Sequence, residues 1–210
     1  MTTVTPFTTE ALVLLAPVIP VVVIDDLEDA VPLAAALVRG GLPAIEVTLR
    51  TPPALAAIER IASEVEGAFV GAGTVTTPQQ VDDALAAGAR FLVSPGATPT
   101  LLDALQASGV PFLPGTATAS DIVALLERGI THAKLFPAEV VGGVGALKAF
   151  AGPFPQMRFC PTGGIGPHNA AEYLAQPNVA CVGGSWMTQG DVEALAAQAA
   201  ALTSKVISPR

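Results

Sequence analysis

Basic residues are scarce in this chain of 210 residues. Ten Lys and Arg stand against 18 Asp and Glu, so the formal net charge is -8, and the few cations do not cluster. A surface that binds nucleic acid or an anionic membrane needs clustered positive charge. The composition therefore excludes both kinds of partner and favours a small-molecule substrate.

Cysteine and histidine are also rare. The two cysteines, Cys160 and Cys181, lie in apolar runs, and the only histidines are His132 and His168. Two cysteines are too few for a disulfide scaffold and are badly spaced for a zinc site. A metal centre rich in histidine is equally excluded. We expect both cysteines to be core residues, and we expect no metal and no cofactor.

Long apolar runs are missing as well, since no stretch reaches the roughly 18 uninterrupted residues that a membrane span needs. Residues 1–10 carry neither the basic patch nor the processing site of a secretory signal. We therefore expect a cytoplasmic protein. With 51% hydrophobic and 13% charged residues, the chain should fold as a single domain over residues 1–210.

Short runs rich in Val, Ile and Phe alternate with amphipathic stretches rich in Ala and Leu, with a period of about 20 to 27 residues. This rhythm is typical of successive βα units. The expected strands are residues 18–24, 44–49, 69–75, 91–94, 111–114, 133–136, 158–161 and 180–182. The expected helices include residues 27–39, 53–65, 78–87, 99–107, 120–128 and 167–174, several of which open with proline.

Eight such units predict an α/β fold of the (β/α)8 TIM-barrel type. An extra N-terminal helix within residues 7–15 would plug the bottom of the barrel, and residues 192–206 would form the last outer helix. The alternative is an open doubly wound sheet, but no G-x-G-x-x-G turn follows the first strand to support it.

Lys134 is one of only three lysines and sits inside an apolar, strand-like run, Thr131-His132-Ala133-Lys134-Leu135-Phe136-Pro137. A lysine buried in such a run can have its pKa lowered by up to roughly 3 to 5, because burial disfavours the charged form. The neutral amine is a nucleophile that can form a Schiff base with a ketone. The alternative is that its ammonium reaches solvent at the strand end.

Glu46 lies on the second expected strand and Lys134 on the sixth. Even-numbered strands of such a barrel contribute to the same interior layers, so the two side chains can face each other. With a period of two, His132 and Phe136 would also point inward beside Lys134, and Thr48 and Arg50 beside Glu46. A purely structural ion pair is the alternative, although such pairs add little stability.

Glycine pairs follow the last two strands, at Gly163-Gly164 and Gly183-Gly184-Ser185. The loops after strands seven and eight often bind phosphate in barrels through backbone N–H groups. These glycines therefore indicate a phosphorylated substrate. Tight turns alone would also explain them.

These residues belong to longer sequence motifs that are specific enough to indicate a protein family. The strings are Glu46-Val47-Thr48-Leu49-Arg50-Thr51, Val70-Gly71-Ala72-Gly73-Thr74-Val75, Ser94-Pro95-Gly96, Lys134-Leu135-Phe136-Pro137-Ala138-Glu139, Arg158-Phe159-Cys160-Pro161-Thr162-Gly163-Gly164-Ile165 and Gly183-Gly184-Ser185-Trp186. From about residue 17 to residue 186 the chain resembles the 2-keto-3-deoxy-6-phosphogluconate (KDPG) aldolases, many of which also act on 4-hydroxy-2-oxoglutarate.

The resemblance implies a metal-free class I aldolase that cleaves KDPG to pyruvate and glyceraldehyde 3-phosphate in the Entner-Doudoroff pathway, and that assembles as a homotrimer. It implies Lys134 as the Schiff-base lysine and Glu46 as the general acid/base. The substrate-binding residues that it implies are Arg50, Thr74 and Thr162 for the pyruvyl carboxylate and nearby oxygens, Phe136 and Pro95 for packing, and Gly163, Gly164, Gly184 and Ser185 for the phosphate.

Two rim segments depart from the family pattern. Gly115-Thr116-Ala117-Thr118 replaces Gly-Ile-Ser-Thr, and Gly166 stands where serine often precedes Pro167. The rival functions are an aldolase for the galactonate epimer or for the unphosphorylated substrate, a metal-dependent aldolase, and a catalytically idle trimeric scaffold.

Overall fold

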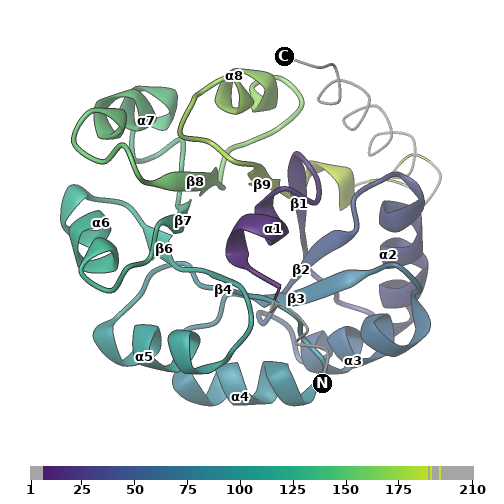
Figure 1. Cartoon of the computed structure of the whole chain (residues 1–210). Helices are drawn as coiled ribbons and strands as arrows, with labels where there is room; N and C mark the ends of the chain where they lie inside the picture. The colour runs from purple at the N-terminus through teal and green to yellow at the C-terminus, as the bar shows by residue number, and fades with distance from the viewer. Residues whose placement is uncertain (1–6, 189, 191–193, 195–210) are drawn as a thin grey trace, which may run out of the picture.

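The computed structural model describes residues 7–188, 190 and 194. Its strands and helices alternate along the chain, and Figure 1 shows the strands gathered at the centre with helices α2 to α8 outside them. The strands are β1 (Val18–Val22), β2 (Ala44–Thr48), β3 (Phe69–Gly73), β4 (Leu92–Val93), β5 (Phe112–Leu113), β6 (Gly115–Thr116), β7 (His132–Leu135), β8 (Arg158–Pro161) and β9 (Val182–Gly184).

The helices match the expected segments closely, apart from α7, which was not among the expected helices. They are α1 (Thr9–Val13), α2 (Ala30–Arg39), α3 (Ala54–Glu64), α4 (Pro78–Ala86), α5 (Pro99–Ala107), α6 (Ala119–Leu126), α7 (Gly143–Ala151) and α8 (Ala170–Leu174), with 3-10 turns η1 (Leu27–Asp29) and η2 (Trp186–Thr188). Glycines at the start of α7 weaken its helical pattern. The helix expected over residues 192–206 lies outside the described residues.

All strand pairs are parallel. Six strands pair in the order β5-β4-β3-β2-β1-β9, and three in the order β6-β7-β8. Only Pro114, which has no N–H to donate, separates β5 from β6 along the chain. Isolated parallel bridges join Phe159 to Val179 and Thr162 to Gly183, next to β8 and β9. The structure thus confirms an α/β fold built on a curled parallel sheet.

Helix starts follow local sequence signals. The side chains of Thr77, Thr98 and Thr118 each accept a hydrogen bond from a backbone N–H in the first turn of α4, α5 and α6. In α6 the Asp121 side chain completes a capping box by accepting from the Thr118 N–H. These caps fix where each helix begins after its strand.

The strands separate two apolar clusters. The larger cluster lies between the strands and the outer helices and includes Ile45, Val47 and Leu135. The second cluster is made by the alternate residues of the strands, such as Ile19 of β1 and Phe69 of β3, together with residues of α1. The strands are therefore buried on both faces.

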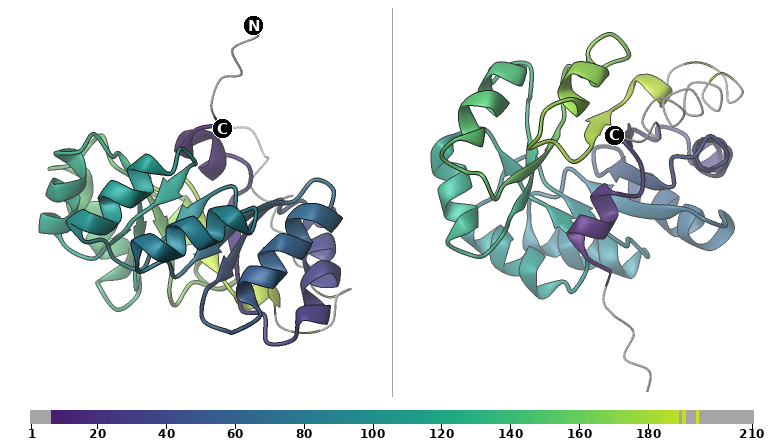
Figure 2. Two further views of the ribbon diagram at one scale, coloured as in Figure 1. Left: turned by 90° about the horizontal axis from the view of Figure 1, so that it is seen from below. Right: turned by 45° about the horizontal axis from the view of Figure 1, so that its top comes forward.

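Helix α1 covers one end of the strands, as both views of Figure 2 show. Its residues Leu12 and Val13 are buried in the second cluster. The hydroxyl of Thr9 exchanges hydrogen bonds with the backbone of Phe112, at 3.3 and 3.4 Å. This confirms the extra N-terminal helix, although it is shorter than the expected segment.

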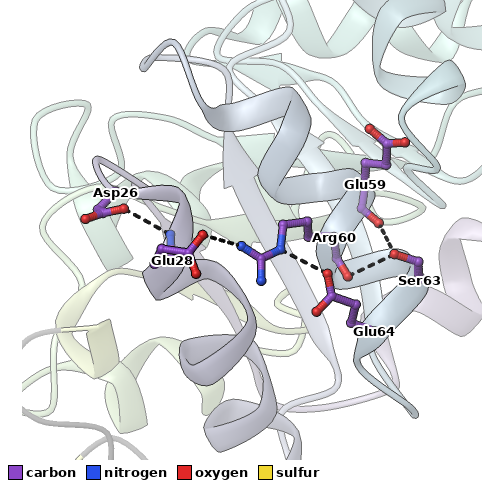
Figure 3. A network of polar contacts seen from close by, with 6 residues as sticks. All are labelled: Asp26, Glu28, Glu59, Arg60, Ser63 and Glu64. Carbon is purple, nitrogen blue, oxygen red and sulfur yellow. Dashed lines mark hydrogen bonds and ion pairs between the residues drawn. The ribbon is translucent and has the colours of Figure 1, made fainter.

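The loop after β1 is tied to α3 by a network on the surface (Figure 3). Arg60 of α3 reaches Glu28 of η1 at 2.8 Å and Glu64 of its own helix at 2.9 Å. Asp26 caps the start of η1 by accepting from the Glu28 N–H. Such exposed pairs contribute little stability but hold the loop against its neighbour.

None of the helices among the described residues combines the length and the apolar character that crossing a membrane requires.

Candidate active site

Lys134 and Glu46 form a buried pair inside the curled sheet. The Lys134 Nζ donates to Glu46 Oε1 at 3.1 Å, and the two side chains are 6% and 3% exposed. The residues are 88 positions apart, on β7 and β2. The predicted contact between the two side chains is therefore present, and the alternative in which the Lys134 ammonium reaches bulk solvent is wrong.

The neighbouring strand leaves room for the Glu46 carboxylate. A Cβ on Gly73 of β3 would lie 2.1 Å from Glu46 Oε1 and 2.4 Å from its Cγ, which is closer than real contacts allow. On the same strand as Glu46, the Thr48 hydroxyl donates to the Val22 carbonyl of β1 at 3.1 Å. The carboxylate is thus held beside a strand that carries no side chain at the point of closest approach.

Phe136 lies next to the amine. The Lys134 Nζ is 5.3 Å from the centroid of its ring, within the range of a cation–π contact. Phe136 follows the end of β7, is half-buried, and precedes a cis peptide bond to Pro137. The expected neighbour on the other side, His132, is half-buried at the beginning of the strand. Burial lowers the pKa of His132, with a smaller opposing effect from Glu10.

Arg50 lies beyond the strand whose alternation predicted that its side chain points inward. Strand β2 ends at Thr48, and Arg50 lies in the following turn, where its N–H donates to the Thr48 carbonyl at 2.8 Å. Its side chain is exposed. The alternation of side chains holds only while the backbone remains extended, so it does not apply to Arg50. Its role toward a carboxylate stays a prediction.

Thr74 has an unusual backbone. It follows β3 directly and has a φ of 59°, and it is the one non-glycine residue with positive φ in the described part of the chain. This is a genuine outlier for a β-branched residue. Strained positions of this kind cluster at ligand-binding sites. The conformation therefore supports the predicted contact of Thr74 with substrate.

Thr162 and Pro95 lie near the ends of β8 and β4. Thr162 is buried, and its hydroxyl donates weakly to the Cys160 carbonyl at 3.4 Å. Gly183 lets Thr162 approach closely, because a Cβ there would lie 2.3 Å from the threonine hydroxyl. Pro95 is half-buried, and its backbone lies against Gly115. Both residues thus stand at the carboxyl ends of strands, the same end as Lys134 and Phe136.

The four residues predicted for phosphate binding lie after β8 and at the end of β9. Gly163 and Gly164 have φ of 99° and 80°, which L side chains rarely adopt. Gly184 is buried against the ring of Trp186, and Ser185 is exposed. The bridge between Thr162 and Gly183 brings the two segments side by side.

Sequence reasoning missed four residues around this site. Glu139, Asn169 and Tyr173 form a hydrogen-bonded network beside Gly164. Gly73 provides the space for Glu46 described above. The string Phe136-Pro137-Ala138-Glu139 contained a signal for Glu139, but nothing in the sequence places Tyr173 next to it.

Cys160 and Cys181 are free and buried, as expected of core residues. The pKa of the Cys181 thiol is raised by its hydrogen bond with Cys160 and by burial. In the described segments, no three side chains of His, Cys, Asp or Glu gather where they could hold a metal ion.

An amine and a carboxylate in hydrogen-bond contact inside a curled parallel sheet can perform two linked tasks. The amine can attack a carbonyl carbon, and the carboxylate can move protons to and from the adduct. Such a pair gives this parallel α/β fold the two groups that an enzyme needs to form a Schiff base with a carbonyl substrate.

Comparison with known proteins makes the class more specific. The model of the family described as "KDPG and KHG aldolase" matches residues 9–201. This chain belongs to that family, and it is an aldehyde-lyase that breaks a carbon–carbon bond.

The names of individual relatives agree with this family. The 2-dehydro-3-deoxy-phosphogluconate aldolase of Pseudoalteromonas atlantica is 53% identical over 175 residues, 83% of this chain and 81% of that protein. The KHG/KDPG aldolase of Escherichia coli K12 is 51% identical over 182 residues, 87% and 85% of the two chains. The KDPG aldolase of Legionella pneumophila, solved with pyruvate as a covalent carbinolamine, is 48% identical with a TM-score of 0.90, covering 93% of this chain and 98% of that one. The enzyme of Zymomonas mobilis ZM4, solved with 3-phosphoglycerate, gives 49% and 0.90, covering 93% and 95%.

Proposed function

We propose that this protein is a class I aldolase that cleaves KDPG to pyruvate and glyceraldehyde 3-phosphate, with Lys134 as the Schiff-base residue. The contact of 3.1 Å between Lys134 and Glu46, both buried, carries the proposal. Two buried charges are a poor way to stabilise a fold, because desolvation offsets most of their attraction. The names of the relatives, and the carbinolamine in the Legionella enzyme, support the same chemistry.

The reaction begins at the Lys134 Nζ. Glu46 takes a proton from the ammonium, and the lone pair of the resulting amine attacks the C2 ketone carbon of the substrate. Glu46 then returns the proton to the hydroxyl of the carbinolamine, which leaves as water to give an iminium. Glu46 accepts the proton of the C4 hydroxyl, the C3–C4 bond breaks, and its electron pair moves into the iminium to form an enamine. Glyceraldehyde 3-phosphate leaves. Protonation at C3 followed by addition of water then releases pyruvate and restores the amine.

The binding residues divide between the two ends of the substrate. Arg50, Thr74 and Thr162 would bind the carboxylate and adjacent oxygens, and a guanidinium suits a planar carboxylate because it can donate two parallel hydrogen bonds. Pro95 and Phe136 would pack against the pyruvyl part. The phosphate would lie at the backbone N–H groups of Gly163, Gly164, Gly184 and Ser185.

We further propose that the curled sheet closes into a (β/α)8 barrel. Strands β5 and β6 belong to one interrupted strand, and the two isolated bridges connect β8 to β9, so the strand order returns to its starting point. A cytoplasmic homotrimer completes the proposal. Sedimentation of the purified protein tests the trimer directly, and a monomer would contradict it.

Borohydride reduction in the presence of pyruvate, followed by peptide mass mapping, tests the role of Lys134. We expect a pyruvyl adduct on Lys134, and we expect Lys134→Ala to abolish it. Lys148→Ala is the matched control, since Lys148 is exposed on α7 and should leave trapping intact. An adduct on Lys148 or Lys205 would overturn the assignment.

Activity assays separate the remaining candidates. Pyruvate release from KDPG distinguishes an active aldolase from an idle scaffold, and insensitivity to a chelator would exclude metal-dependent cleavage. Rates on KDPG, its galactonate epimer and 4-hydroxy-2-oxoglutarate rank the substrates. The relatives named above favour KDPG over the epimer.

A further inference from the structure

The loop of Gly163 and Gly164 needs an external restraint. Both residues have positive φ, and two glycines in sequence are the most flexible backbone that a chain can have. Binding a phosphate through N–H groups requires those groups to point at one place before the ligand arrives, because ordering them on binding would cost affinity. Something other than the glycines must therefore hold the loop.

Neighbouring backbone supplies the first part of this restraint. The N–H of Ala138 donates to the Thr162 carbonyl at 2.8 Å, and the N–H of Glu139 donates to the Gly163 carbonyl at 3.1 Å. Both contacts use carbonyl oxygens and involve neither glycine N–H. They fix the loop after β8 to the segment that follows β7, the strand that carries Lys134.

Side chains supply the second part. The Asn169 Nδ2 donates to the Gly164 carbonyl at 3.0 Å and to Glu139 Oε1 at 3.3 Å. The Asn169 Oδ1 accepts from the N–H of Gly166 at 2.8 Å. The Asn169 amide thus binds both the carbonyl of Gly164 and the N–H of Gly166, and the Glu139 carboxylate orients that amide.

Tyr173 of α8 fixes the carboxylate in turn. The residue is 1% exposed, and its hydroxyl donates a hydrogen bond to Glu139 Oε1. The methylenes of Glu139 also pack against Gly164, where a Cβ would lie 2.4 Å from Glu139 Cγ. Glu139 therefore contacts the loop through its backbone and its methylenes, and its carboxylate is linked to the loop through Asn169.

We propose that Glu139 is a positioning residue for phosphate recognition: through Asn169 it holds the Gly163-Gly164 loop in the shape that receives the phosphate of the substrate. The inference rests on the proposed function, since the phosphate site belongs to it. Glu139 does not itself touch the substrate. Its carboxylate accepts from Asn169 and Tyr173.

The consequence is a selective effect on phosphorylated substrate. Without the Glu139 carboxylate, Asn169 loses one hydrogen-bond partner and the loop samples other conformations. Ordering the loop when the phosphate binds then reduces the net free energy of phosphate binding. The KM for KDPG should rise about tenfold in Glu139→Ala, while kcat and the KM for 4-hydroxy-2-oxoglutarate change less than about threefold. A merely structural role would impair both substrates alike.

Three further variants make the test specific. Glu139→Gln keeps a carbonyl oxygen that can accept from Tyr173 and Asn169, so it should restore a KM for KDPG within about threefold of the wild type. Glu172→Ala removes a nearby exposed carboxylate of α8 that makes none of the hydrogen bonds of this network, and it should leave both KM values unchanged. Asn169→Ala should reproduce the rise in KM, and it decides the matter if Glu139→Ala does not fold.

Steady-state kinetics on both substrates, with circular dichroism to verify folding, give the outcome. Equal changes for the two substrates in Glu139→Ala, an unchanged KM for KDPG, or an equal effect of Glu172→Ala would each overturn the inference. Wild-type protein that releases no pyruvate and traps none would instead overturn the proposed function, so the two failures can be told apart.

Discussion

Replacing Gly73 by alanine should disable the site while leaving the protein folded. Gly73 is buried on β3, and its φ is not positive, so an alanine is compatible with its backbone. The added Cβ would lie 2.1, 2.4 and 2.6 Å from Oε1, Cγ and Cδ of Glu46. Since the strand backbone is held by pairing on both sides, the carboxylate has to move.

The displacement can be worked from these distances. Ordinary contact begins at 3.4 Å, so Oε1 has to retreat by about 1.3 Å from its position at 2.1 Å. Its hydrogen bond to Lys134 Nζ is 3.1 Å long and does not survive a shift of that size in most directions. A misplacement of about 1 Å can cost 10²-fold in rate, and a factor of 100 corresponds to about 2.7 kcal/mol of transition-state stabilisation. Overpacking of this kind typically lowers the free energy of unfolding by about 1 to 3 kcal/mol.

Pyruvate release from KDPG, measured as kcat/KM beside denaturant unfolding, is the assay. Gly145→Ala is the matched control, because nothing lies within 4 Å of a Cβ at that position on α7. We expect the control to keep full activity and Gly73→Ala to lose about two orders of magnitude in kcat/KM. A folded Gly73→Ala protein with wild-type kcat/KM would refute the argument that Glu46 has to stay at its observed position.

Three other perturbations follow from the structure. Thr74→Gly removes backbone strain of the order of 1 to 3 kcal/mol, so denaturant unfolding should show no loss of stability although kcat/KM falls; a clear destabilisation would contradict the strain. Because burial lowers the pKa of His132 below 6.5, the unfolded state binds a proton at His132 more readily than the folded state, and stability is lost as the pH falls through 6.5. In thermal melts from neutral pH to about 5, His132→Asn should reduce this loss of stability with falling pH. An identical dependence of stability on pH in the variant and the wild type would count against it. Arg60→Gln should lower the melting temperature slightly at low salt and not at high salt, and a large effect independent of salt would show that the pair with Glu28 is not a surface contact.

Much of the site could be predicted before any coordinates, and the reason is periodicity. Lys134 stands out because a cation in an apolar run is anomalous, and the alternation along two parallel strands brings it to Glu46. The same rule does not reach Arg50, since β2 ends at Thr48, and the sequence does not mark clearly where a strand ends. Alternation is a property of extended backbone, and Arg50 lies in a turn.

The sequence by itself determined the alternation of strands and helices, apart from α7, and the residue types available for chemistry. These depend on interactions within a few residues, which the local pattern contains. Only the tertiary structure decided that Gly73 makes room for Glu46, and that Glu139 meets Tyr173, 34 positions away. Such contacts depend on the register between strands and on the packing of a helix against a loop, and no local pattern encodes either.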